Sequence, residues 1–214
     1  TAIDIDAGKN LVGAFYQPLA VYCDVDCIAT MNAHDFADGV AESIKYGVLH
    51  NPALFDRIAS EKLTQTSSDL DAIVKDCVAY KNQIVSEDER EKGTRQLLNL
   101  GHTFAHAIEQ LSDFATSHGH AVAIGLAMMA RACLRKGWSE PGTATRIERA
   151  LLANNLPITC DYEATAMLEV CRRDKKADSS AITIVVPHAI GDCGLRTVDY
   201  ETLLELLQLG KEPL

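Results

Sequence analysis

Four of the seven histidines in this 214-residue chain lie in two neighbouring segments, NLGHTFAHAIEQ and SHGHAVAIG, which otherwise read as buried helix. In the first segment, His102 and His106 are four residues apart, which on a helix puts both rings on one face with their β-carbons about 5–6 Å apart. An imidazole is costly to bury without a partner. The pair therefore indicates metal binding or proton transfer: both rings could share one ion, or one could bind metal while the other contacts a substrate.

His118 and His120 favour the metal interpretation. They follow a predicted helix break at residues 112–117 and open a second apolar helix, so imidazoles from two helices can meet at one point. The first pair lacks the Glu of the HExxH metalloprotease signature. A metal site in an enzyme usually has three protein ligands and one open position. We therefore expect another ligand from a different part of the chain.

Glu42 and Lys45 lie three residues apart in the otherwise apolar segment GVAESIKYGVLH. Charged side chains are rarely buried unless they are paired or bind metal. A solvent-facing Glu and Lys is the ordinary alternative, but the apolar residues of this segment leave only a narrow polar strip, which also carries Asp38. Glu42 is therefore a candidate for a third metal ligand, one that binds through a carboxylate oxygen.

A run of charges leads directly into the histidine segment. Arg95, Asn99 and His102 fall at positions i, i+4 and i+7, which form one face of a continuous helix. Arg suits carboxylate or phosphate because its planar fork donates two parallel hydrogen bonds. Lys81 is the lone cation of the stretch CVAYKNQIV and could join this group. We expect these side chains to bind an anionic molecule that carries hydroxyl groups.

Five segments, in order and spread over nearly the whole chain, match the motifs of one family. They are residues 7–18 (AGKNLVGAFYQP), 41–47 (AESIKYG), 88–109 (DEREKGTRQLLNLGHTFAHAIE), 118–125 (HGHAVAIG) and 174–176 (DKK). In these segments the sequence resembles 3-dehydroquinate synthase, a sugar-phosphate cyclase. The resemblance implies a lyase of the shikimate pathway of aromatic amino-acid biosynthesis, which converts 3-deoxy-D-arabino-heptulosonate 7-phosphate to 3-dehydroquinate and phosphate. The implied cofactors are NAD, which transiently oxidises a ring hydroxyl, and a divalent metal, Zn²⁺ or Co²⁺.

The resemblance also implies roles for individual residues. The implied metal ligands are Glu42, His102 and His118. The implied catalytic residues, which contact the substrate, are Lys45, Lys81, Arg95, Asn99 and His106. The other residues implied near the substrate are Glu91 and, on the phosphate side, Asn10 and either Lys175 or Lys176.

Two departures from the family pattern bear on function. His120 stands where the family commonly has Glu in an HGE motif, which removes a carboxylate beside a metal ligand. No GxGxxG opens a strand-to-helix unit, so the family's N-terminal NAD-binding domain is not found in these residues. We expect residues 1–24 to belong to or border that α/β domain, and residues 25–214 to form the helical metal- and substrate-binding domain. Such a C-terminal half is not expected to turn over alone.

Composition agrees with a single helical domain. The chain is 47% hydrophobic, is long enough to bury a sizeable core, and has no apolar run of the roughly 20 residues that a bilayer requires. We expect no membrane partner and no signal peptide. The formal net charge of -10 disfavours nucleic acid as a partner. Seven cysteines without a CxxC pair are typical of reduced thiols and predict a cytoplasmic protein. The resemblance implies a homodimer.

Hydrophobic periodicity predicts a mainly α fold, a helical bundle with a small β-hairpin, which would be the C-terminal half of a two-domain α/β + α enzyme. One strand is expected at residues 19–24. The expected helices lie at about residues 34–49, 52–63, 68–85, 95–112, 118–136, 143–154, 162–172 and 199–209. Residues 181–187 and 193–198 are expected to form the hairpin, with Gly191 and Asp192 in its turn.

Two other functions remain open. A related cyclase that acts on sedoheptulose 7-phosphate or glucose 6-phosphate would share the metal ligands and differ in its substrate contacts. Arg95 and Asn99 favour a substrate with a carboxylate, which those sugar phosphates lack. The alternative from another class is a non-catalytic domain that keeps the helical scaffold to bind a partner. The intact set of candidate ligands argues against that alternative.

Overall fold

The computed structural model describes residues 2–5, 8–14, 16–173 and 180–214, and for Asp4 and residues 8–11 it describes the backbone without the side chain. The first elements are β1 (Ala2–Ile5), β2 (Gly8–Gly13) and a 3-10 helix, η1 (Val25–Thr30). The helices that follow are α1 (Ala33–Leu49), α2 (Pro52–Ser60), α3 (Leu70–Glu87), the 3-10 helix η2 (Thr94–Asn99), α4 (His102–Leu111), α5 (His118–Arg135), α6 (Thr143–Ala153) and α7 (Ala164–Arg173). The chain ends with β3 (Ala181–Ala189), β4 (Asp192–Asp199) and α8 (Tyr200–Lys211).

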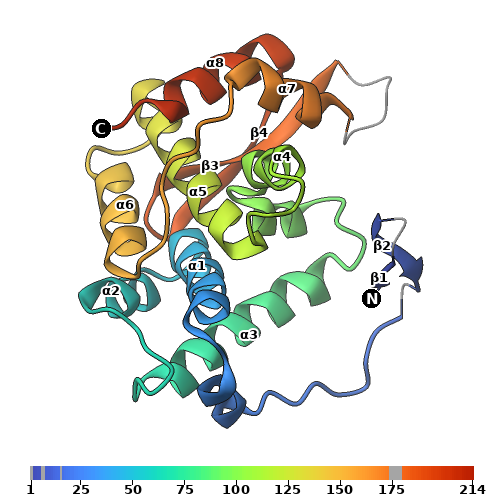
Figure 1. Cartoon of the computed structure of the whole chain (residues 1–214), viewed down its shortest axis with the longest axis vertical. Coiled ribbons are helices and arrows are strands. Elements are labelled where there is room, and N and C mark those ends of the chain that lie inside the picture. Colours follow the sequence, from blue (N-terminus) through green and yellow to red (C-terminus); the bar gives the residue numbers. More distant parts are fainter. Residues whose placement is uncertain (1, 6–7, 15, 174–179) are drawn as a thin grey trace.

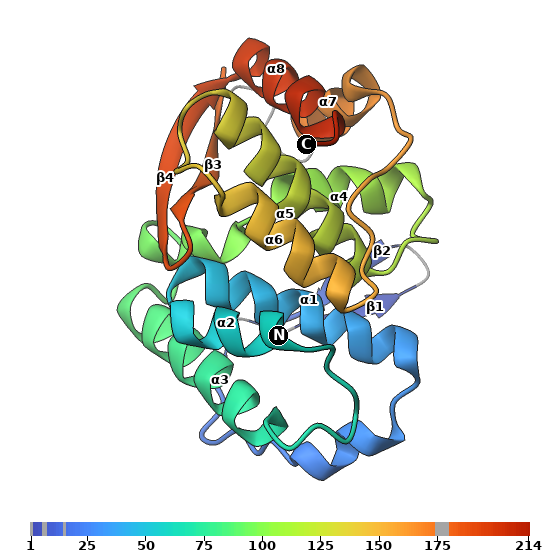
Figure 2. The same ribbon diagram turned by 90° about the vertical axis from the view of Figure 1, so that its left-hand side faces the viewer.

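The central element of the fold is α5. Apart from Arg131 and the terminal Arg135, its sequence is apolar on all sides after the first turn, and a helix of that kind is buried. All residues from Ala121 to Cys133 are buried. α1, α4, α6, α8 and β3 pack against it. Figure 2 shows α5 in the middle of the molecule, with α1 and α2 below it and α7 and α8 above it.

Glycines let α5 approach its neighbours closely. A β-carbon at Gly119 would overlap the backbone of Asp38 in α1. A β-carbon at Gly125 would overlap the carbonyl oxygen of Gly101, directly before α4. A larger residue at either glycine would push the helices apart. The start of α4 is therefore fixed against the first half of α5, and the start of α5 against the first half of α1.

The predicted hairpin is present, with β3 and β4 paired antiparallel and a shift in register between Pro187 and Ala189. Its turn contains Gly191 at φ 87°, a left-handed conformation that glycine adopts without strain. Ile182, Ile184 and Val186 alternate along β3 and join the same buried cluster as residues of α5. The hairpin therefore covers one side of the central helix.

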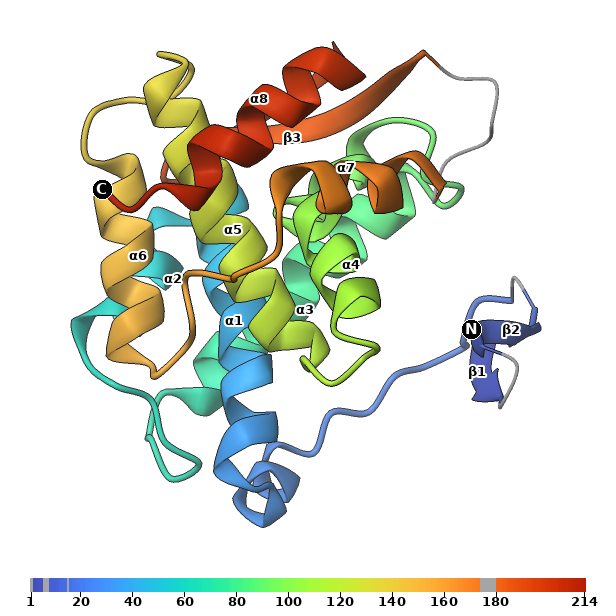
Figure 3. The same ribbon diagram turned by 45° about the horizontal axis from the view of Figure 1, so that its top comes forward.

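The prediction of a strand at residues 19–24 is wrong. These residues form no strand, because Leu19 and Tyr22 are exposed and no described strand lies beside them to complete a ladder. The N-terminal strands lie earlier, in β1 and β2, where no strand was predicted. Figure 3 shows this β1–β2 hairpin standing away from the helices. The side chains of Ile3 and Val12 are exposed.

The single helix predicted at residues 95–112 is also wrong. It is two elements, η2 and α4, because the chain turns at Gly101 with φ 78° to let α5 pass. Periodicity does not reveal this break, since a lone glycine within a helical pattern is tolerated. Arg95, Asn99 and His102 therefore do not share one face of a continuous helix.

The other predicted helices agree with the structure to within a few residues, and the mainly α fold class with a small hairpin is confirmed (Figure 1). Among the helices of the described part of the chain, none combines the length and the hydrophobicity needed to cross a bilayer.

Candidate metal centre

Glu42, His102 and His118 meet where α1, α4 and α5 approach one another. Glu42 lies in the middle of α1, and the two histidines are the first residues of α4 and α5. Oε1 of Glu42 lies 3.5 Å from Nε2 of His102 and 3.4 Å from Nε2 of His118. The structure thus brings three residues from distant parts of the sequence to one point.

The spacing of these atoms suits a tetrahedral zinc ion. Zinc lies about 2.0–2.1 Å from its nitrogen and oxygen ligands, so two ligand atoms on one tetrahedral ion are about 3.3–3.4 Å apart. Oε1 of Glu42 is buried and accepts no hydrogen bond of normal geometry from any residue that the structure describes. A buried acceptor without a partner is costly. A divalent cation between the three side chains would satisfy it, so the residues present fit the metal.

Both imidazoles direct Nε2 toward Glu42. Nδ1 of His102 lies 3.1 Å from the backbone carbonyl oxygen of Leu100, and Nδ1 of His118 lies 3.2 Å from Oε1 of Glu109. A carbonyl or carboxylate oxygen can only accept, so Nδ1 is the donor in both contacts. The lone pair of the neutral ring is then on Nε2. Histidines that bind metal in proteins commonly have this arrangement.

Glu109 is a candidate functional residue that the sequence patterns did not single out. It is 5% exposed and lies seven residues after His102 on α4, at a spacing that places both on one helical face. A lone carboxylate among apolar residues at that spacing was the available signal, because buried carboxylates are paired. Its contact with His118 orients that ring and would make Nε2 a stronger metal ligand.

Lys45 lies beside the carboxylate of Glu42. Its Nζ is 2.6 Å from Oε2 of Glu42, and the residue is 3% exposed. Burial lowers the pKa of the Lys45 ammonium, and the charge of Glu42 opposes this effect. Burial raises the pKa of the Glu42 carboxyl, but the contact with His118 and the charge of Lys45 outweigh it and hold that pKa well below its ordinary value. Glu42 is therefore ionised at neutral pH.

The two imidazoles have opposite pKa shifts. Burial, together with the charge of Lys45, lowers the pKa of His102 to about 4. The contact with Glu109 and the nearby carboxylate of Glu42 raise the pKa of His118 to about 9. At neutral pH the ring of His102 is neutral, whereas His118 would have to lose a proton before it could bind a metal ion.

A cavity of about 520 Å³ opens beside Glu42, His102 and His118. The predicted substrate residues in its wall are Lys45, Lys81, Glu91, Arg95 and Asn99. Although η2 and α4 are separate elements, Arg95 and Asn99 still reach the same cavity as the metal centre. The wall carries three cationic side chains, which suits an anionic molecule.

Arg95 and Asn99 are held in place by neighbouring acceptors. Nη1 of Arg95 donates to the backbone carbonyl oxygen of Glu89 across 2.6 Å. Nδ2 of Asn99 donates to Oε1 of Glu91 across 2.6 Å. Glu91 therefore acts on the cavity through Asn99 as well as by its own charge.

His106 faces a second cavity of about 440 Å³, which shares Glu91, Asn99 and His102 with the first. The rings of His102 and His106 meet edge to face, with their centroids 5.7 Å apart. The metal-ligand group of Glu42 contains His102 but not His106. Of the two alternatives for this histidine pair, the geometry favours the one in which only His102 binds metal.

Three predicted substrate residues lie beyond what the structure describes. Lys175 and Lys176 fall within residues 174–179, and of Asn10, on β2, only the backbone is described. His120 is described and does not join the metal centre. Its Nδ1 lies 2.6 Å from Oδ1 of Asp38.

Comparison with known proteins gives the same family as the sequence motifs. Residues 39–177 match the family model described as 3-dehydroquinate synthase C-terminal, and residues 1–38 match the one described as 3-dehydroquinate synthase N-terminal. The curated 3-dehydroquinate synthase of Syntrophotalea carbinolica is 41% identical over 209 residues, which are 95% of this chain and 58% of that protein. That of Caulobacter vibrioides is 42% identical over 203 residues, which are 90% of this chain and 55% of that protein.

Solved structures of two synthases share the fold. A 2-epi-5-epi-valiolone synthase from Streptomyces hygroscopicus subsp. jinggangensis, with NAD⁺ and Zn²⁺ bound, has a TM-score of 0.84 at 21% identity, covering 98% of this chain and 60% of that one. A 2-deoxy-scyllo-inosose synthase complexed with carbaglucose-6-phosphate, NAD⁺ and Co²⁺ has a TM-score of 0.80 at 21% identity, covering 97% of this chain and 60% of that one. At such identities the likeness shows the fold alone.

The family assignment rests on both family models and on the curated relatives. Together the models cover residues 1–177, and the relatives are about 40% identical over nearly all of this chain. The chain spans less than two thirds of the length of those relatives. It belongs to the 3-dehydroquinate synthase family.

Proposed function

We propose that this chain is the metal- and substrate-binding part of a 3-dehydroquinate synthase, a lyase that converts 3-deoxy-D-arabino-heptulosonate 7-phosphate to 3-dehydroquinate and phosphate. The observation that carries the proposal is the position of Oε1 of Glu42, 3.5 and 3.4 Å from Nε2 of two histidines and beside a cavity lined by cations. Family membership supports the choice of this reaction.

Glu42, His102 and His118 would hold the divalent ion, Zn²⁺ or Co²⁺. A bound ion of this kind polarises the substrate hydroxyl that is oxidised and stabilises the negative charge that develops on its oxygen. Glu109 keeps the ring of His118 in its ligand orientation, and Lys45 binds the second oxygen of Glu42. Two imidazoles and one carboxylate would leave an open coordination position for the substrate.

Lys81, Arg95 and Asn99 would bind the acid and hydroxyl groups of the substrate. Arg95 can exchange its contact with the carbonyl of Glu89 for a charge-assisted bond to a carboxylate, which is stronger. The amide of Asn99, held by Glu91, presents its oxygen to a hydroxyl. With these residues the protein contributes mainly by positioning the substrate and by electrostatic stabilisation.

His106 would contact the substrate from the second cavity, which shares His102 and Asn99 with the first. Asn10 and either Lys175 or Lys176 are proposed for the phosphate group because they match the family motifs. Lysine suits this role, since its ammonium is a compact charge with three donors.

Residues 25–214 are proposed to form the helical metal- and substrate-binding domain, and residues 1–24 to border an α/β domain that binds NAD. The match of residues 1–38 to the N-terminal family model and the separation of the β1–β2 hairpin from the helices support a boundary in this region. These 214 residues alone are then expected not to convert the substrate. The homodimer implied by the resemblance stays a prediction, which analytical ultracentrifugation of the full-length protein tests.

Substrate profiling of the full-length protein with NAD⁺ and Zn²⁺ tests the function. We expect phosphate release from 3-deoxy-D-arabino-heptulosonate 7-phosphate with 3-dehydroquinate as the product. Arg95→Gln should lower kcat/KM by about 10- to 100-fold, because a hydrogen bond to a charged group is lost. Arg149→Gln, at an exposed arginine of α6, is the control and should have wild-type activity. Turnover of only sedoheptulose 7-phosphate or glucose 6-phosphate would exclude the proposed substrate.

A further inference from the structure

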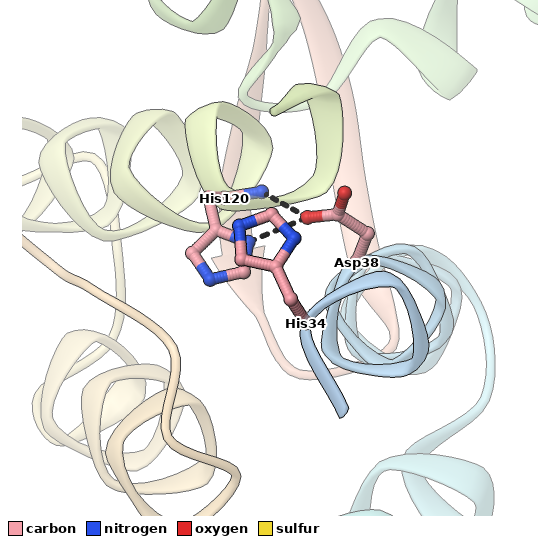
Figure 4. A group of neighbouring side chains, drawn as sticks. All are labelled: His34, Asp38 and His120. Atoms are coloured by element: carbon pink, nitrogen blue, oxygen red, sulfur yellow. Dashed lines mark hydrogen bonds and ion pairs between the residues drawn. The ribbon is translucent and has the colours of Figure 1, made fainter. Parts of the chain in front are cut away.

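A second group of possible metal ligands lies at the crossing of α1 and α5, separate from the ligands of the metal centre. His34 and Asp38 are four residues apart at the start of α1, and His120 lies in the first turn of α5. One ligand atom from each lies within 4.8 Å of the other two. Figure 4 shows the three side chains meeting between the two helices.

Asp38 and His120 are already ordered. Oδ1 of Asp38 lies 2.6 Å from Nδ1 of His120 and accepts from the backbone N–H of His120 and from the hydroxyl of Ser117, both across 2.8 Å. The side chains of Asp38 and His120 are 23% and 19% exposed. Ordered ligands lose little further freedom when they bind an ion. An ion would take the place of the Nδ1 proton, which goes to solvent, and the two ligand atoms would move to about 3.3 Å apart.

His34 is the ligand that has to adjust. Its ring stacks on that of His120 with centroids 4.2 Å apart and an angle of 9° between the planes. A nitrogen lone pair lies in the plane of its ring, so two parallel rings do not both point at one ion. The side chain of His34 is 57% exposed, so the ring can rotate toward Asp38 without disturbing the core. This rearrangement makes the site weaker than one whose ligands are all preset.

The donor set determines the kind of ion. Two imidazole nitrogens and a carboxylate oxygen suit Zn²⁺ and its transition-metal neighbours such as Co²⁺, whereas Mg²⁺ and Ca²⁺ prefer oxygen ligands throughout. Asp35 adds a second negative charge, with its Oδ1 3.5 Å from Nδ1 of His34. Water can complete the coordination, because His34 faces solvent.

We propose that His34, Asp38 and His120 form a second, weaker site for a divalent ion of the zinc class, which ties α5 to α1. The two helices touch at Gly119, where a β-carbon would overlap the backbone of Asp38. His118 and His120 flank that contact in the sequence. An ion at His120 would therefore bind to the same helical turn that carries His118.

Zinc titration of the metal-free full chain, followed by calorimetry, tests the second site. We expect two ions per chain, the second with the lower affinity. His34→Ala should lower the affinity for the second ion by at least about tenfold and leave the affinity for the first ion unchanged. This variant should fold, because His34 is exposed. His120→Gln should lower the affinity for the second ion in the same way. In both variants the Co²⁺ absorption spectrum should lose the signal of the second ion.

Two control variants separate the sites. Glu42→Gln removes a ligand of the metal centre and should leave the second ion bound. His50→Ala removes an exposed histidine beyond the other end of α1 and should leave the affinity for both ions unchanged. A single ion per wild-type chain at millimolar zinc would overturn the proposal. So would a second ion that binds His34→Ala and His120→Gln as tightly as it binds the wild type.

Discussion

Nδ1 of His118 donates to Oε1 of Glu109 across 3.2 Å, so a buried carboxylate stands directly behind one imidazole of the proposed metal centre. The contact joins the end of α4 to the start of α5. A carboxylate in this position fixes the orientation of the ring and makes the opposite nitrogen a stronger ligand. Glu109 is therefore expected to act on the metal without touching it.

Glu109→Gln should weaken zinc binding at the metal centre by about 10- to 100-fold, the usual effect of losing a group that supports a ligand. The amide keeps the size of the side chain and removes its charge. Competition with a chromophoric chelator measures the affinity. Glu163→Gln, at a carboxylate whose side chain is 82% exposed, is the matched control. An affinity of Glu109→Gln within twofold of the wild type would refute the role of Glu109.

Binding of the first zinc ion at about pH 7.5 should release about one proton from the protein. The pKa of His118 is raised to about 9, so this ring is protonated before zinc arrives. The pKa of His102 is lowered to about 4, so this ring is already neutral. Calorimetry in buffers of different ionisation enthalpy counts the protons released. A binding enthalpy that does not depend on the buffer would mean that His118 is neutral in the metal-free chain.

The metal-free protein should lose stability as the pH rises from about 6.5 to about 9.5. The pKa of His118 is about 9 in the folded state and 6.5 ordinarily, so folding favours its protonated form. That contribution is complete below about pH 6.5 and is lost as the pH rises through about 9. Urea unfolding at several pH values measures the effect. His118→Gln should show a smaller loss over this interval, and an unchanged loss would show that other groups cause it.

Gly125→Ala should destabilise the fold by about 1–3 kcal/mol, the usual cost of forcing an extra group into a packed contact. Its β-carbon would overlap the carbonyl oxygen of Gly101 and separate α4 from α5, which carry His102 and His118. Zinc affinity should therefore fall as well. Urea unfolding and a zinc titration measure the two effects.

Gly39→Ala is the control for this substitution. No atom lies within 4 Å of a β-carbon at Gly39, which is in α1. The change should stabilise the helix by up to about 1 kcal/mol, because alanine has the higher helix propensity. Equal effects of the two substitutions would contradict the close contact between α4 and α5.

The helical segments that form the site could be predicted from the sequence, because the apolar patterns around Glu42, His102 and His118 are long. The functional role of Glu109 could not be predicted from the sequence. Its role depends on the position of α5 relative to α4, and no periodicity within one helix encodes that position. The sequence showed a carboxylate in an apolar segment, whereas the partner that makes it functional lies across a helix crossing.

The errors in the fold have a similar cause. The break at Gly101 results from the close approach of α5, a tertiary contact that overrides the local preference for helix. The strand expected at residues 19–24 lacks a partner among the described strands, and β-propensity alone does not make a ladder. By contrast, the β3–β4 hairpin was predictable because its turn, at Gly191, is local.

Anomalous diffraction at the zinc edge, from crystals of the zinc-loaded protein, tests the metal centre most directly. We predict a strong peak about 2.0–2.2 Å from Oε1 of Glu42 and from Nε2 of His102 and His118. Density for zinc elsewhere in the molecule, with no peak between these three side chains, would contradict the account.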